Sequence, residues 1–122
     1  MTKPSFSELQ LIADPTRLRI LSLIHKHPNI CVCQIIHVLD MPQATISKAL
    51  GPLKKQGLVL AKREKQWVKY SLNGQDTHFP LKEILNWAKE LSEIKKDLKT
   101  LDRVQRIPLE KICCNKPWRI KA

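Results

Sequence analysis

Apolar residues recur at helical spacing along the first part of the chain. This period predicts a short helix over residues 4–13. The Asp14-Pro15 pair that follows is typical of an N-cap and a first helical residue. We therefore expect a second helix to begin there and to end before Pro28, because the residue before a proline disfavours helical backbone.

The next two segments have the pattern of a helix-turn-helix. Apolar residues at i, i+3, i+4 and i+7 over residues 32–39 predict one short helix, and the sequence at 40–42 breaks it. A second helix is expected to follow and to end at Gly57. Its narrow apolar stripe leaves a polar face. Two short helices joined by a tight turn predict a helix-turn-helix.

After Gly57 the apolar period changes from 3.6 to 2, which predicts two strands that begin near Leu58 and Val68. The connection at 63–66 is polar and contains no glycine, so a loop longer than two residues is expected. We therefore expect a fold that is mainly α with a small β-hairpin wing, a winged helix-turn-helix.

The last periodic segment predicts one long helix from Pro80 to about Asp102. Apolar residues repeat every seven positions in two rows, which is typical of a coiled-coil seam between two chains. The alternative is a helix whose apolar residues are all buried within one chain. Residues 1–102 are expected to form the winged domain with its dimerisation helices, and 103–122 a basic, cysteine-containing tail. The two rows are Ile84, Leu91 and Leu98, and Trp87, Ile94 and Leu101.

The net charge of +11 is concentrated in two blocks. One basic block is residues 43–70 and the other is residues 103–122. The segment between them, residues 80–102, has no net charge. This distribution favours a polyanion-binding surface and a basic tail over evenly solvated lysines. Together with the helix-turn-helix pattern, it indicates double-stranded DNA as the partner. The polar helix and the hairpin supply the candidate DNA contacts, which are Gln43, Thr45, Ser47, Lys48, Lys54, Lys62, Arg63 and Lys65.

The chain has no apolar run of about 18 residues and no secretory signal pattern at its start. We therefore expect no membrane partner and a cytoplasmic location. Cysteines are kept reduced there, which favours metal-binding or redox chemistry over structural disulfides.

Four cysteines are the candidate metal ligands: Cys31, Cys33, Cys113 and Cys114. Thiolates are soft ligands that favour zinc, cadmium, lead or trivalent arsenic over hard cations. In a regular helix Cys31 and Cys33 would lie about 200° apart, so they are expected to point apart in the free protein. The alternative for Cys31 and Cys33 is that they are small buried side chains that bind no ligand. The alternative for Cys113 and Cys114 is that they are thiols without a function.

An enzyme is not expected. The sequence has no Cys-x-x-Cys motif, no βαβ pattern and no glycine-rich phosphate loop, and it contains three glycines. A DNA-architectural protein without any ligand is a further alternative.

The combined motifs resemble the ArsR/SmtB family of bacterial winged-helix repressors. They are the segments at 13–21, 30–33, 43–50, 57–59 and 67–72. The resemblance implies a repressor that forms a homodimer through its terminal helices. It also implies that the repressor leaves its operator DNA when arsenite or antimonite binds, with cadmium or lead as alternative inducers and no organic cofactor.

The resemblance also guides the choice of ligands. Cys31 and Cys33 match the Cys-Val-Cys of metalloid-responsive members, whereas the third cysteine of some arsenic sensors is Ile36 here. Zinc sensors use histidines of the last helix, and 80–102 has none. Because arsenic(III) takes three thiolates, the tail is expected to supply the third, from Cys113 or Cys114. The alternative is a redox or persulfide sensor of the same fold with no bound metal.

Overall fold

The computed structural model describes residues 6–74 and 79–113. Within these ranges short helices surround one small antiparallel sheet. The helices are α1 (Phe6–Ile12), α2 (Pro15–Lys26), α3 (Val32–Leu39), α4 (Gln43–Lys55), α5 (Leu81–Ala88), α6 (Ser92–Val104) and α7 (Leu109–Cys113). The strands are β1 (Ile30–Cys31), β2 (Val59–Glu64) and β3 (Trp67–Leu72).

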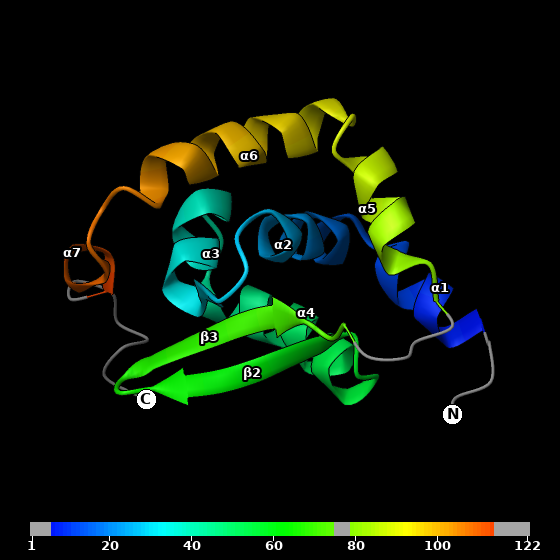
Figure 1. Cartoon of the computed structure of the whole chain (residues 1–122), viewed down its shortest axis with the longest axis horizontal. Helices are drawn as coiled ribbons and strands as arrows, with labels where there is room; N and C mark the ends of the chain where they lie inside the picture. Colours follow the sequence, from blue (N-terminus) through cyan, green and yellow to red (C-terminus); the bar gives the residue numbers. More distant parts are fainter. Residues whose placement is uncertain (1–5, 75–78, 114–122) are drawn as a thin grey trace.

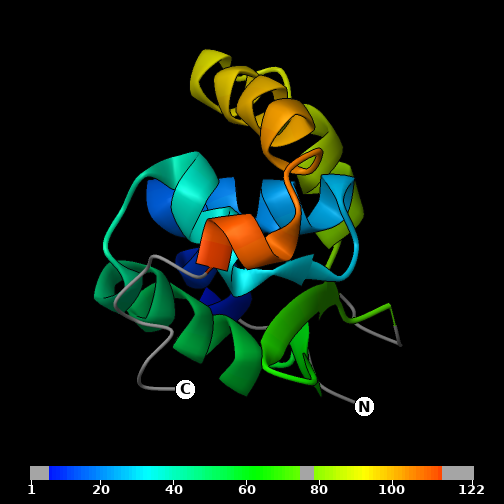
Figure 2. The same ribbon diagram turned by 90° about the vertical axis from the view of Figure 1, so that its left-hand side faces the viewer.

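Helix α2 lies at the centre of the molecule. Helices α5 and α6 arch over α2 and α3, whereas α4 and the β2–β3 hairpin lie on the opposite side (Figure 1; Figure 2). Five consecutive apolar or small side chains of α2, residues 20–24, are fully or almost fully buried, which explains why this helix contacts α1, α4, α5 and α6. The fully buried large side chains are Ile20, Leu21, Leu23, Ile24, Ile30, Ile35, Ile46, Leu53, Leu85, Leu101, Val59 and Val104.

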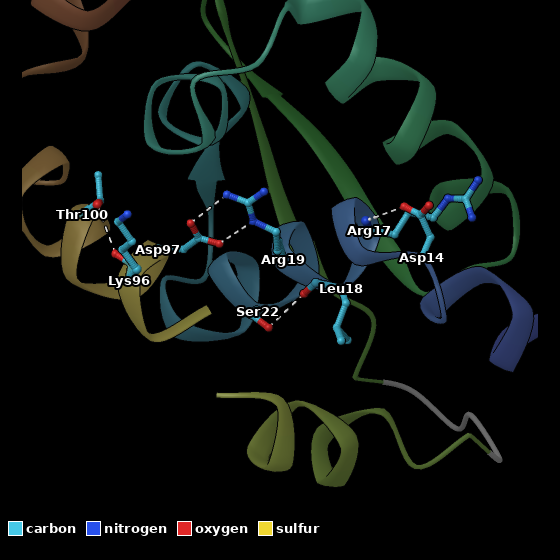
Figure 3. Close-up of polar contacts among 8 residues, drawn as sticks. All are labelled: Asp14, Arg17, Leu18, Arg19, Ser22, Lys96, Asp97 and Thr100. Carbon is cyan, nitrogen blue, oxygen red and sulfur yellow. Dashed lines mark hydrogen bonds and ion pairs between the residues drawn. The ribbon is translucent and has the colours of Figure 1, made fainter. Parts of the chain in front are cut away.

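The predicted start of α2 is confirmed. The Asp14 carboxylate accepts a hydrogen bond from the Arg17 backbone N–H at 3.0 Å (Figure 3), and Pro15 is the first helical residue. The cap satisfies one of the N–H groups that have no partner inside the helix. The helix ends at Lys26, before Pro28, as expected.

The helix-turn-helix and its wing are confirmed as α3, α4 and the β2–β3 hairpin. The expected long loop is wrong. Glu64 pairs with Trp67, so only two residues connect the strands. Lys65 takes a positive φ of 57°, the left-handed conformation that a tight hairpin turn requires and that usually favours glycine or asparagine. Six paired positions of the hairpin hold this turn against the local preference of lysine.

Strand β1 was not predicted. It pairs with β3, which gives the sheet the strand order β1-β3-β2. Cys31 is its last residue and also the N-cap of α3. The cysteine motif is therefore joined through the sheet to the wing.

The prediction of one helix over 80–102 is wrong, because the chain forms α5 and α6 with a break at 89–91. Leu91 has extended backbone angles, φ −69° and ψ 134°. The break lets the two helices point in different directions, so that α5 covers α2 while α6 reaches both α2 and α3 (Figure 1). Burial of Ile94 and Leu101 by α6 stabilises this path.

The heptad rows therefore do not form a continuous seam. In one row Ile94 and Leu101 are buried inside this chain, whereas Trp87 is 62% exposed. In the other row Leu91 is 39% exposed. The expected coiled coil is wrong because a bent pair of helices cannot present seven-residue repeats on one face.

The predicted tail, 103–122, begins inside α6 and includes α7, which packs against α3 (Figure 2). Ile112 of α7 is buried in the core. Cys114 lies outside the described residues, and for Cys113 only the backbone is described. In the ranges that the structure describes, every helix is too short or too polar to span a bilayer.

Candidate nucleic-acid interface and thiol site

The outward face of α4 is polar and sterically open. Ile46, Ala49, Leu50 and Leu53 turn inward and are buried, which leaves Thr45, Ser47 and Lys48 exposed, with Gln43 half-buried at the first position of the helix. These are the predicted contacts. Sequence reasoning missed two small residues on the same face, Ala44 and Gly51, which are also exposed.

Gly51 has no heavy atom within 4 Å of the place where a Cβ would stand. The small residues on this face could have been found from their spacing: 44, 47, 48, 51 and 55 form one helical stripe. A stripe of small and polar side chains allows close approach of a large partner to the helix.

The predicted cations of the wing and of the end of α4 are all exposed. Lys54 lies in the last turn of α4, and the α4 end is tied to the hairpin by the hydrogen bond from the Leu58 N–H to the Leu53 carbonyl at 2.9 Å. Lys62 and Arg63 lie on β2, and Lys65 lies in the turn. The helix that carries Lys48 and Lys54 therefore lies in contact with the strand that carries Lys62 and Arg63.

The two sulfur atoms of the Cys-Val-Cys motif lie 2.9 Å apart. The prediction that they point apart in the free protein is wrong. It assumed that both residues lie within a helix, whereas Cys31 is the extended N-cap residue, with φ −76° and ψ 144°. This conformation turns its side chain back over the first turn of α3, beside Cys33.

Cys31 and Cys33 are both buried, with 1% and 0% exposure. Burial raises the pKa of the Cys31 thiol, and this effect outweighs the opposite effects of the backbone N–H groups of Cys33, Val68 and Gln34 and of the Lys69 charge. Cys31 is a free thiol, whereas Cys33 is disulfide-bonded in this structure.

Two neighbours of the motif were missed by sequence reasoning. The Gln34 side-chain oxygen accepts a hydrogen bond from the Cys31 N–H at 2.9 Å, which fixes the backbone at the start of α3. Lys69 of β3 pairs directly with Cys31 of β1. The capping role of Gln34 could have been predicted, because a glutamine three positions after an N-cap residue is typical of a capping box. The position of Lys69 beside Cys31 could not be predicted without knowing that β1 exists.

The described residues contain no group of three or more His, Cys, Asp or Glu side chains that could hold a metal ion. Among the described residues, Cys31 and Cys33 therefore offer two neighbouring sulfur atoms as ligands but no third ligand. The predicted third ligand, the side chain of Cys113 or Cys114, lies outside what the structure describes. The backbone of α7, which ends at Cys113, packs against α3.

Known proteins that resemble this chain are regulators by name. An uncharacterized HTH-type transcriptional regulator of Methanocaldococcus jannaschii is 52% identical over 54 residues, which are 44% of this chain and 61% of that protein. An arsenic resistance transcriptional regulator of Pseudomonas putida is 39% identical over 51% of this chain and 48% of its own length. A cadmium resistance transcriptional regulatory protein of Listeria innocua is 33% identical over 50% of this chain and 51% of its own length. The matches therefore span between 48% and 61% of the length of these relatives.

Among solved structures, reduced HlyU from Vibrio cholerae superposes with a TM-score of 0.61 and 26% identity, covering 70% of this chain and 85% of HlyU. The structural likeness confirms the winged helix-turn-helix. The family model described as "Bacterial regulatory protein, arsR family" matches residues 14–60, from the cap of α2 to the start of the wing. Over this segment, the chain is similar to the arsR family of bacterial regulatory proteins.

Proposed function

We propose that the protein is a transcriptional repressor that binds operator DNA and leaves it when a thiophilic ion binds its cysteines. The observation that carries the DNA-binding part is the open polar stripe of α4 beside a wing of exposed cations. The major groove admits one α-helix, and α4 offers it a face without bulky apolar side chains. Loss of binding by variants of this face tests the assignment.

The contacts divide by chemistry. Gln43 can hydrogen-bond a base edge at two points, and Thr45 and Ser47 can contact a base or a phosphate. Lys48, Lys54 and the wing cations Lys62, Arg63 and Lys65 neutralise phosphates. Phosphate contacts set affinity and position but carry little sequence information.

We further propose a homodimer, formed at the face between α1, the start of α2 and the break that separates α5 from α6. An apolar pocket of about 610 Å³ opens there, and it is lined by both segments that were predicted to dimerise. Its walls include Leu9, Trp87 and Leu91, which are 52%, 62% and 39% exposed. A second copy would bury these side chains and would hold two α4 helices at a fixed spacing, as two half-sites require.

The proposed inducer site consists of Cys31 and Cys33, with a third sulfur from Cys113 or Cys114. Metal–sulfur bonds are about 2.3 Å long, so sulfur atoms 2.9 Å apart are close enough to bind one ion after a small separation. The packing of α7 on α3 supports a ligand from the tail. Binding requires Cys33 in its reduced form, since a disulfide sulfur is not a thiolate.

The thiol site is connected through the fold to both DNA-binding elements, the helix α4 and the wing. Cys31 caps α3, the helix that supports α4, and it also ends β1, the strand that pairs with the wing. A ligand shifts an equilibrium only by its different affinity for the two states. The start of α3, where both sulfur atoms must move to reach one ion, is where that difference would arise.

A titration of operator release tests this function. Reduced protein bound to its operator is titrated in parallel with arsenite, antimonite, cadmium, lead and zinc. We expect release by at least one of the thiophilic ions at concentrations that leave zinc without effect. No release by any of them would contradict the inducer assignment while leaving DNA binding intact.

A thiol-redox or persulfide-sensing repressor is the second candidate, and the disulfide-bonded state of Cys33 favours it. In a redox sensor, the oxidation of a thiol would change the start of α3, whereas in the first candidate the binding of an ion would do so. Release by a thiol-specific oxidant with no release by arsenite would support it over the first candidate.

A further inference from the structure

Gln34 carries a buried amide into a largely apolar core. It lies in the first turn of α3 and is 6% exposed. Ser22 and Asp97 are the other polar residues that are buried in the part of the chain that the structure describes. A buried polar group costs free energy unless a hydrogen bond compensates for it. For Gln34 this hydrogen bond comes from the Cys31 N–H, which donates to the Gln34 Oε1 at 2.9 Å.

The contact between these two residues is reciprocal. The Cys31 side chain faces the backbone N–H of Gln34, which completes a capping box at the start of α3. An N-cap residue lies just outside the helix with extended backbone, and Cys31 has φ −76° and ψ 144°. Because the hydrogen bond is buried, loss of the Gln34 oxygen would leave the Cys31 N–H without its partner and shielded from water.

The backbone of Cys31 determines how far apart the two sulfur atoms of the motif lie. With extended backbone, the Cys31 Sγ lies 2.9 Å from the Cys33 Sγ. If Cys31 instead joined α3 as a helical residue, the two side chains would point about 200° apart around the helix axis. The cap from Gln34 stabilises only the extended arrangement, so it favours the conformation in which the sulfur atoms are in contact.

We propose that Gln34 is the positioning residue of the thiol site, which holds Cys31 and Cys33 so that their sulfur atoms react as a pair. This role rests on the proposed thiol site and deepens it. It serves ion binding and thiol oxidation alike, because both need the two sulfur atoms close together. The cap involves no sulfur atom of Cys33, so it does not depend on the disulfide in which Cys33 is found.

The reduction potential of the Cys31–Cys33 pair tests this role, in the full chain with Cys113→Ser and Cys114→Ser. Cys31 and Cys33 are then the only cysteines. Oxidised glutathione reacts with the two thiols to give the Cys31–Cys33 disulfide and two molecules of reduced glutathione. The equilibrium constant of this exchange measures how well the fold holds the two sulfur atoms together. Acid quenching at pH 7 equilibrium, followed by mass spectrometry, gives the disulfide fraction at each glutathione ratio.

Two substitutions of Gln34 separate its hydrogen bond from its size. Gln34→Met keeps the length of the side chain without the acceptor, and it should lower the equilibrium constant by about tenfold, which raises the reduction potential by about 30 mV. Gln34→Glu should keep the constant within about threefold of the parent, because a carboxylate oxygen accepts the same hydrogen bond. The added charge should matter little, since thiols of ordinary pKa and the disulfide are both neutral at pH 7.

Asp14→Ala is the matched control. Asp14 caps α2 by accepting a hydrogen bond from the Arg17 N–H at 3.0 Å, at the start of that helix, whereas the thiol site follows its end. Its loss weakens a helix cap without touching Cys31, so the reduction potential should not change. An equal shift in Asp14→Ala and Gln34→Met, or no shift in Gln34→Met, would overturn the positioning role alone.

Hydrogen exchange gives a second measurement that needs no substitution of Gln34. The Cys31 amide, which is bonded to the buried Gln34 oxygen, should exchange at least about 100-fold more slowly than in the unfolded chain. Exchange at the unfolded rate would overturn the positioning role even if Gln34→Met does not fold. If the parent protein forms no Cys31–Cys33 disulfide at any glutathione ratio, the two thiols do not act as a pair, and the proposed thiol site is wrong together with this role.

Discussion

Arg19 of α2 and Asp97 of α6 form a two-point ion pair between residues 78 positions apart in the sequence. The Arg19 Nε donates to Asp97 Oδ2 at 2.8 Å and Nη2 donates to Oδ1 at 3.0 Å (Figure 3). The hydrogen bonds to Asp97 raise the pKa of Arg19, and Asp97 is only 5% exposed. This pair connects the arching helix α6 to the central helix of the DNA-binding unit.

Substituting Asp97→Asn should lower the free energy of unfolding by about 2 kcal/mol, because it leaves a partly buried guanidinium without its counter-charge. The solvent that reaches Arg19 keeps the cost below that of a fully buried pair. Urea denaturation of both proteins measures the difference. Asp102→Asn on the exposed side of α6 is the control and should cost little. Equal effects of the two substitutions would show that the ion pair contributes nothing specific.

DNA affinity should fall steeply as salt increases, because several lysines must release counterions. Removing one phosphate contact, by Lys48→Ala or Lys62→Ala, should reduce the slope of log affinity against log salt by about 0.9. Gln43→Ala should instead reduce discrimination between operator and random DNA at an almost unchanged slope. Fluorescence anisotropy at four salt concentrations measures both. A wild-type slope near zero would rule out the proposed interface.

The sequence predicted those parts of the fold in which local signals agree with the tertiary contacts. Asp14-Pro15 caps α2, and the apolar spacing in α3 and α4 matches their buried faces. The predictions failed where distant contacts decide. The break at Leu91 follows from the packing of α6 across α2 and α3, and the left-handed Lys65 follows from the strand pairing on both sides of it.

The candidate site was predicted in part for the same reason. The cysteine pair is visible in the sequence, but its geometry depends on β1, which is two residues long and exists only because β3 pairs with it. Extended backbone at Cys31 brings the two sulfur atoms together, contrary to the helical geometry that the spacing alone suggested. The same pairing places Lys69 beside the site.

The dimer face gives a separate prediction. Replacing Leu9 and Trp87 by lysine should produce a monomer, because like charges would be buried between two copies of the apolar pocket. Sedimentation equilibrium measures the mass, and operator binding should weaken with the loss of the second half-site. Leu60→Lys is the control, since Leu60 is 50% exposed but lies on the wing. If the Leu9/Trp87 variant remains a dimer, the interface lies elsewhere.

Burial of Cys31 should be visible in its reactivity. Its raised pKa means that the neutral thiol persists in the folded protein at pH values at which an unfolded thiol, of pKa about 8.5, has already ionised. Ionisation of this thiol should therefore lower the stability of the fold as the pH rises above about 8.5.

Alkylation by iodoacetamide measures this difference in a variant that keeps Cys31 alone, with the other three cysteines changed to serine. The reaction of the folded variant should be slower than that of the urea-unfolded variant, and its midpoint should lie at higher pH. A midpoint at or below that of the unfolded chain would contradict the burial argument.

The central claim is that the Cys31–Cys33 pair converts ion binding into release from DNA. The most direct measurement is operator release by arsenite from reduced wild-type protein, from Cys31→Ser and Cys33→Ser, and from the double variant Cys113→Ser/Cys114→Ser. We predict that each single variant binds operator as the wild type does but is not released, and that the double variant is released only at higher arsenite concentration. Normal release of the Cys31 and Cys33 variants, with no release of the double variant, would place the sensor in the vicinal pair and contradict the account.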